Sequence, residues 1–234
     1  MSEMPKAQQV FQFVQDRRVN FENFYMGQNA DVCAALHALA DGANPEQVIT
    51  LIGPVGSGRS HMLQAVCAQA EKAKRVAYYV PLGARQDYAV EMLDGLESGD
   101  VICIDDVDAV CGNLDWEEAI FHLYNRALSA GCHVVFALPQ PANHLDWALA
   151  DLKSRLGAGL LFSVQALPDD EKQSAIIHKA ACRGMHLPPN VAQYMLTHLS
   201  RNMSELSIVL DQLDDASIQQ GRAITVPLLR SLSK

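Results

Sequence analysis

The stretch at residues 51–60, LIGPVGSGRS, constrains the fold more than any other part of the chain. An apolar run ends at Gly53, and from His61 onward the apolar residues recur with helical spacing. Glycines at positions 53, 56 and 58 allow a tight turn whose N–H groups point inward. A strand, a glycine loop and a helix N-terminus in this order form a cradle for phosphate oxygens. We call residues 53–60 the phosphate loop.

The phosphate loop departs from the pattern G-x-x-x-x-G-K-[ST] at one position, because Arg59 stands where lysine is expected. Lysine is a compact charge that reaches the phosphates, whereas arginine is longer, planar and forked. Ser60 keeps the hydroxyl that such loops offer to Mg²⁺. We expect binding to rest on backbone amides and hydrolysis to suffer; the alternative is a β–α turn that binds nothing. The expected nucleotide-binding residues are Gly53, Pro54, Val55, Gly56, Ser57, Gly58, Arg59, Ser60 and His61.

Composition narrows the class of protein. With 234 residues, 49% of them hydrophobic, the chain can bury one sizeable core and a small second domain. It has no run of about 18 apolar residues and no basic segment followed by an apolar one at its N-terminus, so we expect a soluble, cytoplasmic protein without a membrane span. The six cysteines form no CxxC pair and are expected to be reduced and buried. A net charge of −9 argues against direct, sequence-specific DNA binding.

Strand and helix patterns alternate up to about residue 167, which predicts an α/β fold with a five-stranded parallel sheet covered by helices on both faces. The later strands are expected at 75–82, 100–105, 133–138 and 160–164, and helices at 32–39, 88–96, 114–128 and 151–156. From Pro168 onward only helices are predicted, at 169–182, 190–200, 202–220 and 226–232, with Asn202 and Glu205 spaced as a capping box. This part is expected to be a small all-α lid.

Two charged sites lie outside the phosphate loop. The third strand ends in Asp105 and Asp106, where acids can hold a Mg²⁺ ion near the loop and align water; Asp106 is a methylene shorter than the glutamate usual there. The alternative is a pair of acids that cap a turn. Arg155 lies near the end of a short helix before Gly157. It could serve catalysis, or it could simply interact with the helix dipole and with water.

The first 20 residues form a tail with little periodicity. Gln8, Phe11 and Phe13 follow a pattern with which an extended peptide can anchor in an apolar pocket of a partner. The alternative is a terminal strand that packs on its own domain.

Together these features resemble the AAA+ P-loop ATPases, and more closely the nucleotide-binding domain of the replication initiator DnaA. The resemblance covers about residues 21–234 and is carried by 23–29 (NFYMGQN), 104–107 (IDDV), 120–125 (IFHLYN), 211–217 (DQLDDAS) and 221–225 (GRAIT). It implies a tail at 1–20, a nucleotide-binding α/β domain at 21–167 and a helical lid domain at 168–234, and it adds Asn29 to the nucleotide site. DnaA continues into a helix-turn-helix DNA-binding domain, which we do not expect here.

Within that group the chain is similar to the Hda family of regulatory inactivators of DnaA. The resemblance implies a negative regulator of chromosomal replication initiation, tethered to the DNA polymerase III sliding clamp (beta subunit) through Gln8, Phe11 and Phe13. It implies that Arg155 acts in trans as an arginine finger on ATP held by DnaA. We expect a bound adenine nucleotide, ADP or ATP with ADP favoured, and Mg²⁺ on Ser60 and Asp105. A homo-oligomer is compatible with these features.

Two departures from the family pattern concern hydrolysis by the chain itself. Ser204 stands where DnaA-like lids place an arginine that reaches the nucleotide, and no polar residue follows the fourth strand near Leu138. With Arg59 and Asp106, these predict a weak or absent ATPase activity. Two other functions stay open: an autonomous ATPase that loads or remodels a partner using Asp106 and Arg59, and a clamp-tethered binding module without activity.

Overall fold

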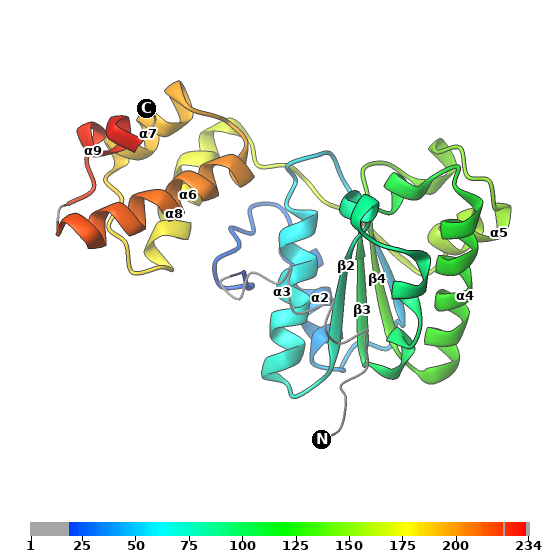
Figure 1. The fold of residues 1–234 in the computed structure, drawn as a ribbon. Helices are drawn as coiled ribbons and strands as arrows, with labels where there is room; N and C mark the ends of the chain where they lie inside the picture. The colour runs from blue at the N-terminus through cyan, green and yellow to red at the C-terminus, as the bar shows by residue number, and fades with distance from the viewer. Residues whose placement is uncertain (1–18, 222, 233–234) are drawn as a thin grey trace, which may run out of the picture. The chain divides into compact units, whose positions relative to one another are not determined.

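The computed structural model describes residues 19–221 and 223–232, and the chain divides into two compact units (Figure 1). The first unit is Asn29–Gln165 together with the segment that ends at Phe21. The second unit begins at Ala166 and also includes Glu22–Gln28. Sequence analysis placed this short segment in the nucleotide-binding domain, but it packs with the lid helices instead.

The first unit is built on a five-stranded parallel sheet in the order β2-β3-β4-β1-β5, so the predicted α/β class is confirmed. The strands are β1 Val48–Ile52, β2 Ala77–Pro81, β3 Val101–Asp105, β4 His133–Leu138 and β5 Leu160–Ser163. β1 lies between β4 and β5, and Ile52 is in register with Leu138. The carboxyl ends of β1, β3 and β4 therefore lie along one edge of the sheet, where ligands of such folds bind.

Helices cover both faces of the sheet, with α2 (Ala30–Ala40) and α3 (Arg59–Lys72) on one side and α4 (Leu114–Ala130) and α5 (Ala150–Leu156) on the other (Figure 1). Strand residues alternate between the faces: Ile102, Val134 and Phe136 join the fully buried cluster with α4 and α5. This packing follows from the apolar runs of the strands and the helical spacing of the segments between them.

The helix expected at residues 88–96 is wrong. The chain there forms short 3-10 turns, η2 (Val90–Leu93) and η3 (Leu96–Ser98), after η1 (Leu82–Asp87). Asp94 is extended, with φ −75° and ψ 132°, and Gly95 has φ 80°, so a continuous helix cannot pass through them. Two further 3-10 turns, η4 (Val107–Val110) and η5 (Ala142–His144), follow β3 and β4.

The second unit packs α6 (Asp169–Ala181), α7 (Pro189–His198), α8 (Met203–Gln220) and α9 (Val226–Leu232) around its own apolar core. His178 Nε2 donates to Glu22 O at 2.9 Å, and the centres of the His178 and Tyr25 rings lie 6.1 Å apart. These contacts hold Glu22–Gln28 against α6. The predicted capping box is wrong in one half. Asn202 Oδ1 accepts from Ser204 N–H at 2.9 Å, but the Asn202 N–H bonds to Ser200 Oγ.

All six cysteines are free. Four are buried, Cys111 is half-buried, and Cys182 is exposed, contrary to expectation. Burial raises the pKa of the Cys33 thiol to about 11. Along the described residues we find no cluster of His, Cys, Asp or Glu that could hold a metal ion, and no helix there is both long and apolar enough to cross a membrane.

Candidate functional site

The phosphate loop connects β1 to α3 at the carboxyl edge of the sheet. The Gly53 N–H donates to Leu138 O at 3.1 Å, which ties the start of the loop to the end of β4. A Cβ on Gly53 would lie 2.5 Å from Val164 O and 2.9 Å from Ser57 Oγ, so only glycine fits there. The Ser57 N–H donates to Pro54 O at 3.1 Å and closes the turn. The loop thus has the local geometry that the sequence predicts.

The helix α3 begins after Gly58, its N-cap residue, which has φ 97° and no side chain to cap the helix. Gly56 has φ 82°, a second position that requires glycine in this turn. The first N–H groups of a helix have no partner inside the helix, so those of Arg59 and Ser60 remain available for an anion. This end of α3 can therefore bind phosphate oxygens.

Two side chains of the loop are buried, and each has a polar atom with no hydrogen-bond partner among the described residues. Arg59 is 7% exposed and Ser57 is 5% exposed. Among the residues that the structure describes, neither Arg59 Nη1 nor Ser57 Oγ forms a hydrogen bond. A buried donor without an acceptor costs about 1–3 kcal/mol, and more when it is charged. Phosphate oxygens would satisfy both groups, so the loop fits a nucleotide, although its binding of one remains a prediction.

Asp105 ends β3 and is 2% exposed. The Tyr79 hydroxyl on β2 donates to Asp105 Oδ2 at 2.7 Å, and the Asp106 N–H donates to Oδ1 at 3.0 Å. Burial and the neighbouring Asp105 carboxylate raise the pKa of Tyr79, which keeps it a donor. Both oxygens of Asp105 are thus engaged, and a Mg²⁺ ion would have to share this carboxylate with Tyr79. Sequence analysis missed Tyr79; its only signal is a tyrosine near the end of an apolar strand.

Asp106 adopts a left-handed conformation, with φ 50° and ψ 48°, and is the N-cap residue of η4. Non-glycine residues rarely adopt it, and such strain is commonly found at functional sites. Burial and the Asp105 charge raise the pKa of Asp106, while the Arg59 charge opposes that shift. The described residues show no direct ion pair between Arg59 and Asp106, so an ion or a phosphate could interact with both.

Two other predicted nucleotide-binding residues have contacts within the unit. Asn29 is buried, its Nδ2 donates to Gln165 O at 2.9 Å, and its Oδ1 accepts from the Gln165 N–H at 2.8 Å. These bonds join the start of α2 to Gln165, just after the end of β5. His61 Nε2 lies 3.0 Å from Asn20 O. Their role in binding a nucleotide remains a prediction.

Arg155 is exposed on the last turn of α5, and its Cζ lies 5.4 Å from the centre of the Tyr124 ring. It makes no ion pair with any residue that the structure describes. The adjacent Leu156 O accepts from Thr50 Oγ1 at 3.2 Å, so this end of α5 lies beside the middle of β1 and not at the phosphate loop. Among the described residues, no hydrogen bond or ion pair joins Arg155 to the phosphate loop.

The remaining predicted residues divide into two groups. Gln8, Phe11 and Phe13 lie outside the described residues. Leu138, where no polar residue was found, is fully buried at the end of β4. Ser204 lies in the first turn of α8, which begins at Met203 in the second unit.

Comparisons with known proteins place both units. Residues 15–163 match the family model described as the bacterial DnaA ATPase domain, and residues 169–232 match the one described as Hda, lid domain. Domain III of the Thermotoga maritima replication initiation protein DnaA is similar with a TM-score of 0.74 and 20% identity, over 90% of this chain and 93% of that one.

Two other solved structures show the same fold. AMPPCP-bound DnaA from Aquifex aeolicus matches with a TM-score of 0.67 and 22% identity, over 86% of this chain and 66% of that one. The Thermotoga maritima RuvB Holliday junction branch migration motor matches with a TM-score of 0.54 and 16% identity, over 86% of this chain and 65% of that one.

Proposed function

The chain belongs to the bacterial DnaA ATPase domain family and has a lid of the Hda type, and from this we propose that it is a negative regulator of replication initiation that acts on DnaA. In this proposal it stimulates hydrolysis of the ATP that DnaA holds. The observation that carries the proposal is a contrast within the described residues of one unit: the phosphate loop has buried donors without a partner there, whereas Arg155 is exposed and makes no ion pair with them.

In this proposal the chain also binds a nucleotide of its own, which serves as a structural ligand. ADP is favoured over ATP in this role. Arg59 and the N–H groups at the start of α3 bind its phosphates, which satisfies the two buried donors of the loop. Ser60 and Asp105 are the residues that would hold Mg²⁺, which neutralises phosphate charge when bound. Because Tyr79 already occupies one oxygen of Asp105, and Asp106 is shorter than the usual glutamate, hydrolysis by the chain itself is weak.

Arg155 serves the nucleotide of the partner. An arginine finger neutralises the charge that spreads over the transferring phosphoryl group and accelerates hydrolysis about 10³- to 10⁵-fold, or about 4–7 kcal/mol. Three features support this role: Arg155 is exposed, it has no ion pair among the described residues, and it is stacked on Tyr124, which limits its rotamers. A guanidinium presented in this way can reach a second molecule.

Tethering to the sliding clamp completes the proposal. Gln8, Phe11 and Phe13 anchor the tail in an apolar pocket of the clamp. The tether raises the concentration of the chain near newly replicated DNA, and this requires no new contact with DnaA. Regulation is therefore confined to DnaA molecules close to a clamp.

The test is single-turnover hydrolysis of labelled ATP preloaded on DnaA, with this protein added and the clamp either loaded on DNA or omitted. We expect acceleration only with the loaded clamp, and its loss in the Phe11→Ala, Phe13→Ala double variant, since the tail anchors the protein. If the wild-type protein binds the clamp but hydrolysis is not accelerated, the proposal fails and a clamp-tethered binding module remains.

A second candidate is an autonomous ATPase that loads or remodels a partner. The observation in its favour is the Asp105 and Asp106 pair, whose charges lie close to Arg59. Steady-state turnover of ATP by the isolated protein tests it: turnover that falls in an Asp106→Ala variant would support this candidate over the regulator.

A further inference from the structure

Glu117 is a fully buried carboxylate on α4, with 0% of its surface exposed. Charged side chains are almost never buried to this extent unless they are paired. Glu117 accepts three backbone hydrogen bonds: Oε1 from Gly112 N–H at 2.6 Å and Ala148 N–H at 3.2 Å, and Oε2 from Leu149 N–H at 2.7 Å. Three backbone N–H groups therefore stabilise this charge. Among the described residues, no cation pairs with it.

The three bonds join two elements that are distant in the sequence. Gly112 precedes α4, whereas Ala148 and Leu149 precede α5, and Leu149 is the N-cap residue of α5. The N–H groups of Ala148 and Leu149 lie just before the first turn of α5, so these bonds hold the chain where it enters the helix. A carboxylate at a helix N-terminus is also favoured by the helix dipole. Glu117 therefore fixes the start of α5 against α4.

The other end of α5 is held as well. Thr50 Oγ1 on β1 donates to Leu156 O at 3.2 Å, and Arg155 stacks on Tyr124 at 5.4 Å. Glu117 and Tyr124 are seven residues apart on α4, a spacing that puts both side chains on one face of a helix. One face of α4 thus contacts the start of α5 and the side chain of Arg155 near its end.

We propose that Glu117 is a positioning residue for Arg155: through the backbone of Ala148 and Leu149 it fixes the direction in which α5 presents the guanidinium to DnaA. The inference rests on the proposed function of Arg155. A finger must reach the transferring phosphoryl group in one geometry, and a displacement of about 1 Å can cost about 10²-fold in rate. A helix of seven residues is too short to hold that geometry alone.

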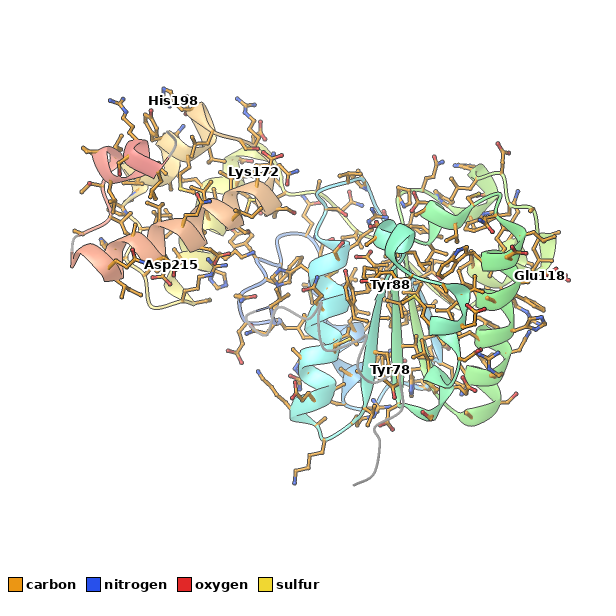
Figure 2. All side chains as sticks on the ribbon, viewed as in Figure 1. Tyr78, Tyr88, Glu118, Lys172, His198 and Asp215 are labelled. Carbon is orange, nitrogen blue, oxygen red and sulfur yellow. The ribbon has the colours of Figure 1, made fainter. Side chains whose placement is uncertain are left out.

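The test variant is Glu117→Gln, which keeps the shape of the side chain but replaces one acceptor oxygen with an NH₂ group. Its control is Glu118→Gln, because Glu118 is exposed on the outer side of α4 (Figure 2). We expect Glu117→Gln to lower the maximal acceleration of DnaA-bound ATP hydrolysis about 10- to 100-fold. The concentration at half effect and the affinity for ADP should not change. Amide hydrogen exchange in α5 should quicken in Glu117→Gln and stay unchanged in Glu118→Gln.

A double variant separates positioning from a general loss of structure. Adding Glu117→Gln to Arg155→Ala should cause no further loss of acceleration, because the residue that Glu117 positions is already absent. Glu117→Asp, which keeps the charge but is shorter, replaces Glu117→Gln if that variant does not fold, and the same loss is expected. The inference would be overturned, while the proposed function stands, if Glu117→Gln and Glu117→Asp accelerated hydrolysis as well as the wild type. It would also be overturned if Glu117→Gln lowered the acceleration by the same factor in the Arg155→Ala background as in the wild type. If the wild type itself does not accelerate hydrolysis, the proposed function fails, and the inference fails with it.

Discussion

Arg59 and Arg155 lie in the same unit but in opposite surroundings. Arg59 is 7% exposed, and its Nη1 has no hydrogen-bond partner among the described residues. Arg155 is exposed, and its guanidinium lies over the Tyr124 ring. A buried cation without a partner needs a ligand inside the unit, whereas a stacked, exposed cation can serve a second molecule.

The backbone around the two arginines differs in the same way. At the phosphate loop, the N-cap residue of α3 is a glycine, so the first N–H groups of the helix receive no side-chain cap from it and can bind a ligand. At α5, Glu117 accepts from the residues before the helix and Thr50 donates to its last carbonyl. Open donors are typical of a binding site, and a helix held at both ends is typical of a rigid support. This difference underlies the separate roles that we propose for the two arginines.

Gly53→Ala should have the largest effect on the phosphate loop, with no effect at α5. Its Cβ would lie 2.5 Å from Val164 O, a backbone atom that cannot move alone. We expect a loss of about 2–4 kcal/mol in the free energy of unfolding and loss of nucleotide binding. The control is Gly56→Ala, where a Cβ meets open space and only its φ of 82° is unfavourable, at about 1 kcal/mol. Equal urea midpoints for the two variants would show that the loop is not tightly packed.

Arg59→Ala should weaken ADP binding about 10- to 100-fold, which is the loss expected for hydrogen bonds between charged groups. The melting temperature without nucleotide should change little, since removing an unsatisfied buried guanidinium offsets the lost packing. Calorimetric titration with ADP measures the affinity. An unchanged affinity would place the phosphates elsewhere and would remove one side of the comparison.

Tyr79→Phe should release Asp105 from a 2.7 Å hydrogen bond at a cost of about 1–2 kcal/mol in stability. Mg²⁺ should then strengthen nucleotide binding more than it does in the wild type, because the carboxylate no longer shares its oxygen. Tyr78→Phe is the control, since neighbouring residues of a strand face opposite sides. The same response to Mg²⁺ in all three proteins would mean that Tyr79 does not restrict the metal.

Asp106→Asn should have the smallest effect, and its sign depends on pH. Because the pKa of Asp106 is raised in the folded protein, its ionised form is destabilising above that pKa. At neutral pH the variant should be slightly more stable than the wild type in thermal unfolding, and the gain should be small because the group is half-exposed and screened by solvent. The gain should begin to shrink as the pH falls through the raised pKa of the folded protein, and it should vanish below the ordinary pKa of aspartate, where the folded and unfolded wild type are both protonated. A gain that is constant with pH would instead reflect only the preference of asparagine for the left-handed conformation.

The elements of the fold could largely be predicted because each depends on local spacing. The strand at His133–Leu138 and the helix at Val226–Leu232 have the bounds that the sequence predicted. The prediction of a helix at 88–96 was wrong because the apolar residues there have helical spacing, which gives no sign that Gly95 adopts a left-handed conformation. Local pattern also gave no reason to place Glu22–Gln28 with the lid, since that depends on contacts with His178.

The supports of the site could not be predicted. Tyr79 lies 26 residues from Asp105, and Glu117 lies 32 residues from Leu149. Sheet order and helix packing bring each pair together, and a buried polar residue inside an apolar pattern does not indicate its partner. Arg59 and Ser60 could be proposed because the phosphate-loop motif fixes their spacing, and Asp105 because it ends an apolar strand. The residues that hold them in place have no such signal.

The most direct test is the single-turnover rate of ATP hydrolysis on DnaA with Arg155→Ala supplied at a saturating concentration beside the clamp. Lys153→Ala, which removes a different cation from the same helix, serves as the control. The account predicts that Arg155→Ala binds ADP like the wild type but loses at least about 10³-fold of the acceleration, while Lys153→Ala keeps it. An Arg155→Ala variant that accelerates hydrolysis as well as the wild type would contradict the assignment of this arginine to the partner's nucleotide.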